Sequence, residues 1–246
     1  MDDDAWDDMS SEYDDNVENN LDPVISSFIS EEIRIVSNLC KKIIRSNTKC
    51  TVIDMGSGTG RVLFALRDIL GDSVSYCGID SSKPMIQLSK NKQASLGFND
   101  VLFLNDDATS TKIDELFDSD STKIALCMYN TVGVIPAAKR QQFFDNMIRL
   151  AGTDGLALVS AFNGDDFAFV APKIYLPMKK MVKQIDEDSF DKQKLGFKNK
   201  LGYYSQWFTK NQLLEFMQSK GQPIPISLPL NSKLYTFGHV FPNRNL

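Results

Sequence analysis

The sequence predicts an α/β fold built on a mostly parallel sheet, and three observations support this prediction. Between Thr48 and Asn163, short β-branched runs alternate with longer helical patterns, as they do in successive βαβ units. A glycine-rich turn follows the first of these runs, at 52–61. Polar residues follow the later runs, at the sheet edge where α/β proteins bind ligands. A chain of 246 residues is long enough for one such domain with insertions.

The pattern of the chain predicts each element in turn. Apolar runs bounded by glycine or polar residues predict strands at 50–56, 73–80, 101–107, 123–130 and 156–163. Helical spacing between these runs predicts helices at 59–70, 83–96, 113–117 and 137–150. The alternation stops after Asn163, so 164–208 is predicted to be an insertion that ends in a strand at 202–208. A helix at 209–220 follows, and two closing strands, at 223–230 and 233–241, are predicted to pair as an antiparallel hairpin.

The charges are unevenly distributed along the chain. The formal net charge is −5, but residues 1–30 contain ten acids and no lysine or arginine, which leaves the remainder at +5. Within the acidic segment, apolar residues recur at spacings of three and four, which predicts a helix with an apolar stripe. These residues are Trp6, Met9, Tyr13 and Val17.

Two helices are therefore predicted before the first strand. Asp22-Pro23 is predicted to end the first, and Ser30 to cap a second that begins with Glu31 and Glu32. These two helices lie within residues 1–47 and precede the sheet-forming part of the chain at 48–246.

The cysteines and the N-terminus bear on compartment. Four cysteines are spread along the chain without a CxxC pair, so we expect buried free thiols and no metal site. The start MDDDAWDD lacks the features of a secretory signal, and no apolar stretch approaches the length of a membrane span. A cytoplasmic protein without a membrane partner is expected.

The glycine-rich turn has the sequence VIDMGSGTGR at 52–61. Such a turn lets a ligand approach the backbone and face the N-terminus of the following helix. A dinucleotide fingerprint would need a third glycine at position 61, which is Arg61, and a P-loop would need a Gly-Lys-Ser/Thr ending. Both nucleotide-binding alternatives are therefore disfavoured.

This turn resembles motif I of the class I S-adenosylmethionine-dependent methyltransferases, in which G-x-G-x-G follows an acid at a strand end. Three further features stand in the order that this family requires: GID ending at Asp80, NDDA at 105–108 and MYNT at 128–131. The resemblance implies a seven-stranded Rossmann-like sheet with an antiparallel last strand. It also implies S-adenosylmethionine as cofactor and S-adenosylhomocysteine as product. It further implies that residues 1–47 form a helical lid on a methyltransferase domain at 48–246. The apolar stripe of the first helix would then face the cofactor cleft, with its acids toward solvent or the lysines of the insertion.

The resemblance also implies which residues bind the cofactor. Asp80 would accept both ribose hydroxyls, and Asp107, or Asp106 if the strand register differs, would contact the adenine amino group. Arg61 would lie near the methionine carboxylate or pair with an acid, and Met85 would flank the adenine or belong to the core. The complete predicted set is Tyr13, Asp54, Gly56, Ser57, Gly58, Gly60, Arg61, Asp80, Ser81, Met85, Asp106, Asp107, Ala108 and Tyr129.

The stretch at 127–131, CMYNT, bears on the methyl acceptor. It lacks the Asn/Asp-Pro-Pro-aromatic motif of adenine and glutamine N-methyltransferases, and it resembles small-molecule members with an Asn-Thr-x-Gly turn. Tyr129 and Asn130 are the predicted catalytic residues, contacting substrate or the methionine side. The alternatives are strand-end packing for Tyr129 and a turn for Asn130.

Aromatic residues are predicted to wall the acceptor site, because GYYSQWF at 202–208 resembles a strand that covers the substrate in small-molecule members. The predicted substrate residues are Trp6, Asn130, Tyr203, Trp207 and His239. His239 is the one histidine, and a core position is favoured for it over a role as general base. Without the usual base, an amine acceptor is favoured over a hydroxyl.

Other function classes remain as alternatives. The +5 body and basic insertion would suit an RNA-modifying enzyme, but the acidic segment and a pI near 5.0 disfavour a nucleic-acid partner. A protein-directed methyltransferase and a non-catalytic S-adenosylmethionine-binding protein are further alternatives. We expect a small-molecule methyltransferase that is a monomer or a homodimer.

Overall fold

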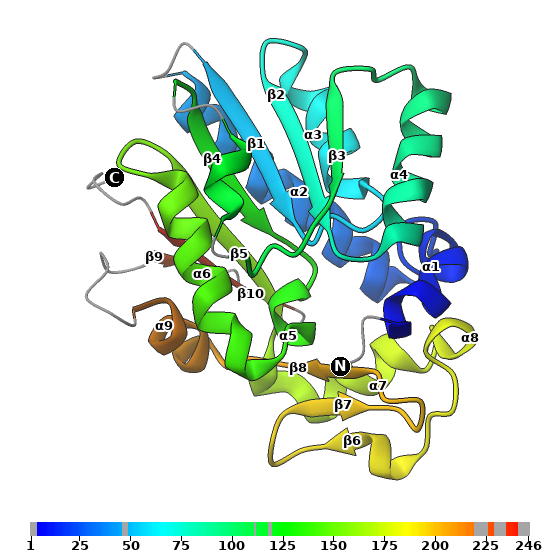
Figure 1. The fold of residues 1–246 in the computed structure, drawn as a ribbon. Helices are drawn as coiled ribbons and strands as arrows, with labels where there is room; N and C mark the ends of the chain where they lie inside the picture. The colour runs from blue at the N-terminus through cyan, green and yellow to red at the C-terminus, as the bar shows by residue number, and fades with distance from the viewer. Residues whose placement is uncertain are drawn as a thin grey trace.

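A twisted sheet forms the centre of the computed structural model (Figure 1). The structure describes residues 4–45, 49–110, 112–117, 120–218, 226–228 and 235–240. Within these ranges, Asp4, Ala5, Asp114, Gln218 and the segments 226–228 and 235–240 are described by their backbone alone.

Five strands of the central sheet run parallel, as the βαβ alternation predicted. They are β1 (Cys50–Met55), β2 (Ser75–Asp80), β3 (Val101–Asn105), β4 (Thr122–Cys127) and β5 (Leu156–Phe162). Their order is β3-β2-β1-β4-β5. The α/β Rossmann-like fold with N-terminal helices is thus confirmed.

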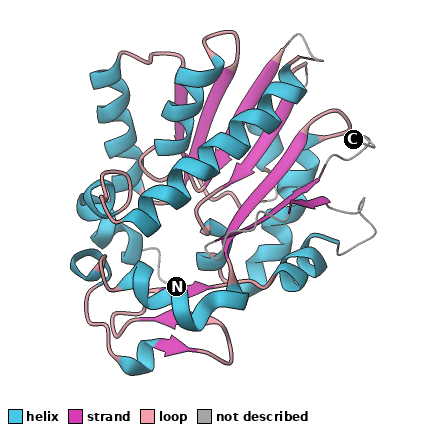
Figure 2. Ribbon diagram, turned by 180° about the vertical axis from the view of Figure 1, so that it is seen from behind, coloured by secondary structure: helices cyan, strands magenta, loops and turns pink. Residues whose placement is uncertain are grey.

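Helices cover both faces of this sheet (Figure 2). On one face are α2 (Pro23–Ile44), α3 (Arg61–Leu70) and α4 (Lys83–Leu96), and on the other are α6 (Ala137–Ala151), η1 (Ile113–Leu116) and α9 (Lys210–Gln218). Alternate residues of each strand enter the two cores: Val52 joins one, whereas Ile53 joins the other. Because both faces are covered, the strands are apolar throughout, and every residue of β5 is buried.

The sheet continues beyond β5 with β10 (Tyr235–Val240) and β9 (Ile226–Leu228). Strand β10 pairs antiparallel with β5 and with β9. His239 lies on β10 opposite Leu158, but its side chain falls outside the described part, as do those of the whole strand.

The N-terminal helices correct one predicted boundary. Helix α1 (Asp4–Asn16) has the expected apolar stripe, but α2 begins at Pro23 and not at Ser30. The Asp22 carboxylate caps it by accepting a bond from the Val24 amide at 2.9 Å, and Pro23 stands in its first turn. An Asp-Pro pair suits a helix start, since proline lacks an amide that the first turn does not use.

The insertion at 164–208 folds as a unit beside the carboxyl ends of the parallel strands (Figure 1). It begins with η2 (Gly164–Asp166), α7 (Phe167–Tyr175) and α8 (Lys179–Val182), and a short η3 (Glu187–Ser189) precedes a three-stranded antiparallel sheet. That sheet contains β6 (Phe190–Asp191), β7 (Gly196–Lys198) and β8 (Tyr204–Gln206). The strand predicted at 202–208 is shorter because it leaves this sheet at Trp207, and Phe208 instead bridges to Asn163 beside the central sheet.

None of the helices in the described ranges is both long enough and apolar enough to span a lipid bilayer. Helix α2 is the longest, and its buried residues pack against α3, β5 and α7. Helix α1 instead contacts α4 and α8. Helix α2 reaches the carboxyl edge of the sheet as well, since its Phe28 ring meets those of Tyr129 and Phe162.

Candidate functional site

A cavity of about 270 Å³ lies at the carboxyl ends of the parallel strands, close to the volume of a small-molecule site. It is lined by strand ends, by α1 and by the insertion. The predicted site residues that line it are Trp6, Tyr13, Gly56, Gly58, Asp80, Ser81, Met85, Asp107, Ala108, Tyr129, Asn130 and Tyr203. Asp54, Ser57, Gly60 and Arg61 lie behind it, buried around the glycine-rich turn.

The glycine-rich turn has a backbone that other residues would strain. Gly56 has φ +86°, and a Cβ there would lie 2.3 Å from Cγ2 of Thr131. Gly60, with φ +87°, stands at the N-cap of α3. The amides of Gly56 and Ser57 both donate to the carbonyl of Ile79, which holds the turn against β2. The turn therefore brings its backbone close to the cavity.

Asp80 ends β2 at the wall of the cavity. Its Oδ2 accepts from the Gly58 amide at 2.8 Å, and its Oδ1 accepts from the Ser82 amide at 2.9 Å. Burial raises the pKa of this carboxyl above its usual value, although the two amide bonds oppose the rise. Both carboxylate oxygens thus stand beside the turn, where a diol could bind.

The end of β3 decides between the two candidate acids. Asp107 lines the cavity, whereas Asp106 does not and accepts a bond from the Asp107 amide. Asp107 Oδ1 accepts from the amide and hydroxyl of Thr109, and its Oδ2 lies 3.2 Å from Nζ of Lys139. These bonds and the Lys139 charge lower the pKa of Asp107 despite its partial burial.

The chain turns sharply after β4, which ends three residues before the predicted strand end. Tyr129 and Asn130 both adopt left-handed conformations, with φ of +50° and +63°. The Asn130 amide nitrogen donates to Ser205 Oγ and to the Gln206 carbonyl, and its oxygen accepts from the Phe162 amide at 3.0 Å. Asn130 lines the cavity, but its side chain ties the insertion to β5 and leaves Tyr129 as the more available group of the pair.

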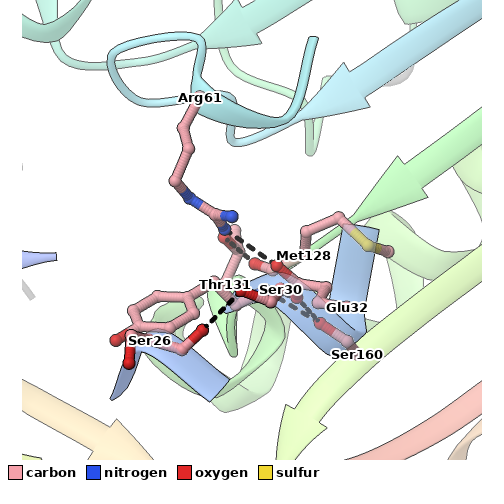
Figure 3. A network of polar contacts seen from close by, with 8 residues as sticks. Ser26, Ser30, Glu32, Arg61, Met128, Thr131 and Ser160 are labelled. Carbon is pink, nitrogen blue, oxygen red and sulfur yellow. Dashed lines mark hydrogen bonds and ion pairs between the residues drawn. The ribbon is translucent and has the colours of Figure 1, made fainter. Parts of the chain in front are cut away.

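Glu32 joins these elements and was not among the predicted site residues (Figure 3). Its carboxylate is fully buried. Oε2 accepts from Nη2 of Arg61 at 2.8 Å, and Oε1 accepts from the Tyr129 amide at 2.7 Å and from the Ser160 hydroxyl. The Arg61 guanidinium also lies 5.3 Å from the centre of the Tyr129 ring. Of the two alternatives for Arg61, the pairing with an acid is observed.

The charge of Arg61 is maintained by this pairing. Burial alone would lower the pKa of its guanidinium, but the Glu32 carboxylate raises it above the usual value. A signal for Glu32 exists in the sequence, because it precedes Val36, Cys40 and Ile43 at helical spacing on the buried stripe of α2. Because the helix was expected to begin at Glu31, Glu32 was interpreted as a first-turn acid and not as a member of the buried stripe.

Among the described residues, four buried side-chain polar atoms around the glycine-rich turn have no hydrogen-bond partner. They are Asp54 Oδ1, Ser57 Oγ, Arg61 Nη1 and Tyr129 Oη. Burial raises the pKa of the Asp54 carboxyl well above its usual range, and Glu32 and Asp80 add to the rise while Arg61 opposes it. Because buried polar groups are usually paired, such a cluster indicates a ligand that carries both donors and acceptors.

Helix α1 covers the cavity with the apolar stripe that the sequence predicted. Trp6, Tyr13 and Val17 line it, and a Cβ at Gly58 would lie 3.9 Å from the Tyr13 ring. Its acids are expected to face solvent or the lysines of the insertion. Asp8 and Asp15 are exposed, but the described contacts of Asp7 and Asp14 go to the glycine-rich turn, Ser82 and α4 and not to the insertion. Asp7 accepts from the Ser82 hydroxyl at 2.5 Å.

The ion pairs of this N-terminal segment centre on Lys92 of α4. Asp14 lies 3.2 Å from Lys92 Nζ, and Glu18 pairs with the same ammonium. Asp14 also accepts from the Thr59 hydroxyl, within the glycine-rich turn, at 2.5 Å. The acids therefore fasten α1 to the two loops that form the cavity wall.

Of the two aromatic residues predicted on the 202–208 strand, one lines the cavity and the other does not. Tyr203 lines the cavity, 5.5 Å from Trp6 between ring centres. Trp207 is fully buried instead, packed against Phe162 and Phe167 with its Nε1 donating to the Tyr175 hydroxyl at 3.0 Å. The prediction that Trp207 walls the acceptor site is wrong, because the residues that follow β8 turn into the core.

Comparisons with known proteins agree with this geometry. Residues 46–221 match a family model described as a methyltransferase domain. A relative from Nautilia profundicola, named carboxy-S-adenosyl-L-methionine synthase, is 28% identical over 152 residues, which are 61% of this chain and 60% of the relative. A second of the same name, from Desulfotalea psychrophila, is 34% identical over 84 residues, 33% of this chain and 34% of that relative. The match therefore spans less than two thirds of either relative.

Solved structures share the fold at low identity. A S-adenosylmethionine-dependent methyltransferase from Clostridium acetobutylicum has a TM-score of 0.62 at 12% identity, covering 95% of this chain and 97% of that one. The 1,6-didemethyltoxoflavin-N1-methyltransferase of Burkholderia thailandensis, solved with 1,6-didemethyltoxoflavin and S-adenosylhomocysteine, has a TM-score of 0.60 at 14% identity. That match covers 97% of this chain and 87% of the other.

Proposed function

The chain belongs to the methyltransferase domain family, and from that premise we propose that it transfers a methyl group from S-adenosylmethionine to a nitrogen of a small-molecule acceptor. It is a class I S-adenosylmethionine-dependent methyltransferase. We also propose that β10 is the antiparallel last strand of the seven-stranded form of this fold; its antiparallel pairing with β5 supports this.

The observation that carries the proposal is the set of unpartnered polar atoms beside the glycine-rich turn. The amino acid part of the cofactor has an ammonium and a carboxylate, which suit the free oxygen of Asp54 and the free Nη1 of Arg61. Asp80 offers its carboxylate to the ribose hydroxyls, and Asp107 and Met85 line the cavity on the side of β3 and α4. These residues fit the cofactor.

When bound, the cofactor supplies a methyl group already activated by its sulfonium. A neutral acceptor nitrogen would take that methyl group while the sulfur keeps the electron pair of the broken carbon–sulfur bond, and an N–H acceptor would then release its proton to solvent. The protein orients the acceptor and excludes water, which α1 and the insertion do by closing over the cavity. Tyr129 lines the cavity and lies between Arg61 and Phe162.

Calorimetric titration with S-adenosylmethionine and S-adenosylhomocysteine is the first test, and lack of binding by both would refute the proposal. Incubation of cell extract with methyl-labelled cofactor should place the label in the small-molecule fraction. Label in RNA or protein would favour the macromolecular alternatives. A second readout is mass spectrometry of the cofactor after the reaction, which should detect S-adenosylhomocysteine. Detection of carboxylated S-adenosylmethionine would instead indicate the activity stated in the names of the curated relatives.

Deleting residues 1–20 should weaken S-adenosylhomocysteine affinity by about tenfold, roughly 1.4 kcal/mol. The deletion removes the Tyr13 ring over Gly58 and the bonds of Asp7 and Asp14 to the cavity loops. Because Met9 and Val17 are buried, Tyr13→Ala tests the same contact with less effect on packing. Leu21→Ala, at a side chain 94% exposed, is the control. Unchanged affinity and turnover after the deletion would mean that the segment is only an acidic tail.

A further inference from the structure

The cavity has a second half beyond the glycine-rich turn, between α1 and the insertion. We call this half the acceptor chamber and define it by Trp6, Phe162, Tyr175, Met178, Met181 and Tyr203, all of which line the cavity. The Trp6 and Tyr203 rings meet edge to face at 5.5 Å, and Phe162 meets Tyr129 in the same manner at 5.4 Å. Aromatic rings and flexible thioethers together form a surface that suits a flat apolar molecule.

The charged side chains of the cavity lie in its other half. Asp80 and Asp107 stand at the ends of β2 and β3, and Lys139 pairs with Asp107. Within the described ranges, no charged side chain lines the acceptor chamber. Lys179 and Lys180 belong to the same segment as Met178 and Met181, but they are exposed and do not line the cavity. An ion in the chamber would therefore lose its hydration without gaining an opposite charge from the protein.

The hydroxyl groups around the chamber do not supply a base. The Tyr175 hydroxyl accepts from Trp207 Nε1. Burial raises the pKa of Tyr129, Tyr175 and Tyr203 above their usual value, so all three stay protonated at neutral pH. The chamber can hold a ring, but its described residues cannot remove a proton from one.

Resting on the proposed function, we propose that the acceptor is an uncharged planar aromatic compound whose nucleophile is a weakly basic ring or aryl nitrogen. An aliphatic amine is protonated at neutral pH, so it has no lone pair to attack with and its charge would lie beside the cofactor's sulfonium without a carboxylate to offset it. The carboxylate of a carboxylated acceptor would find no cationic side chain to pair with in the chamber. An alcohol or phenol would need a base. A weakly basic aromatic nitrogen meets none of these obstacles.

Three bicyclic probes of nearly equal size test this inference: isoquinoline, tetrahydroisoquinoline and isoquinoline carboxylate. At neutral pH they are respectively neutral, cationic and anionic. Calorimetry on protein saturated with S-adenosylhomocysteine should give isoquinoline an affinity at least about tenfold above that of either charged probe. Equal or tighter binding of a charged probe would overturn the inference, and so would binding of none of the three at millimolar concentration.

Variants of the insertion test whether the probe binds in the acceptor chamber. Tyr203→Ala should lower isoquinoline affinity about tenfold, whereas Tyr203→Phe, which keeps the ring, should preserve it. Phe169→Ala removes an exposed ring of the insertion outside the cavity and should leave affinity unchanged. Loss with Phe169→Ala, or no loss with Tyr203→Ala, would contradict the assignment. Because cofactor binding is measured first, its absence would refute the proposed function, and its presence without the probe pattern would refute only this inference.

Discussion

Replacing Glu32 with glutamine lowers the free energy of unfolding by about 3 kcal/mol, the expected cost of leaving a buried charge without its counterion. The Arg61 side chain is only 7% exposed and that of Glu32 is fully buried, so the guanidinium has little access to solvent. Glutamine retains the size of the side chain and can still accept a bond from the Tyr129 amide. The loss therefore reports mainly the missing charge. Urea or guanidinium denaturation measures it.

A double-mutant cycle separates this pairing from general damage to the core. Arg61→Met removes the buried cation, so the variant carrying both Glu32→Gln and Arg61→Met should be more stable than the sum of the two single effects predicts. Additive effects would contradict the pairing. Glu31→Gln is the matched control, since its side chain is 34% exposed and pairs with Arg34 on the helix surface. It should cost about half a kcal/mol or less.

Replacing Asp80 with alanine should lower S-adenosylhomocysteine affinity at least about a hundredfold, because two hydrogen bonds to a charged acceptor are lost, each worth roughly 1.5–3 kcal/mol. The amides of Gly58 and Ser82 would also lose the acceptor that positions the glycine-rich turn. Calorimetric titration measures the effect. Asp68→Ala, at an exposed acid of α3, should leave affinity unchanged. Intact affinity in Asp80→Ala would mean that the ribose is bound elsewhere.

The raised pKa of Asp80 adds a pH dependence to this prediction. Only the ionised carboxylate accepts from both ribose hydroxyls, so cofactor affinity should be highest above the raised pKa and fall as pH decreases through it. The raised value places this fall at a higher pH than for an exposed aspartate. Asp80→Asn should bind weakly and lose this acid limb. An unchanged acid limb in Asp80→Asn would assign the titration to another group.

The fold and much of the cofactor side could be predicted from local patterns. The alternation of apolar runs and helical spacing predicted the parallel strands, because strands covered on both faces must be apolar along their whole length. The glycines at 56, 58 and 60 and the acid that ends β2 lie together because parallel strands end at one edge. Helix α4 has the predicted bounds, with Ser82 and Gly97 at its two ends.

Other features depend on residues far apart in the sequence. Asp107 lines the cavity and Asp106 does not. The reason is that β3 ends at Asn105, whose side-chain amide donates to the backbone carbonyls of Asp80 and Ser81. Trp207 enters the core because its partner Tyr175 comes from α7. This helix contains an internal proline and was not predicted. No local pattern near Trp207 contains that information.

By itself, the sequence determined the class of fold, the edge of the sheet at which the cavity lies and the apolar stripe of α1. These features depend on periodicity and turn chemistry, which act over a few residues. Only the tertiary structure decided that Glu32 neutralises Arg61 and that the acceptor chamber is apolar. A buried ion pair and the polarity of a cavity depend on which distant side chains share a space without water, and packing decides that.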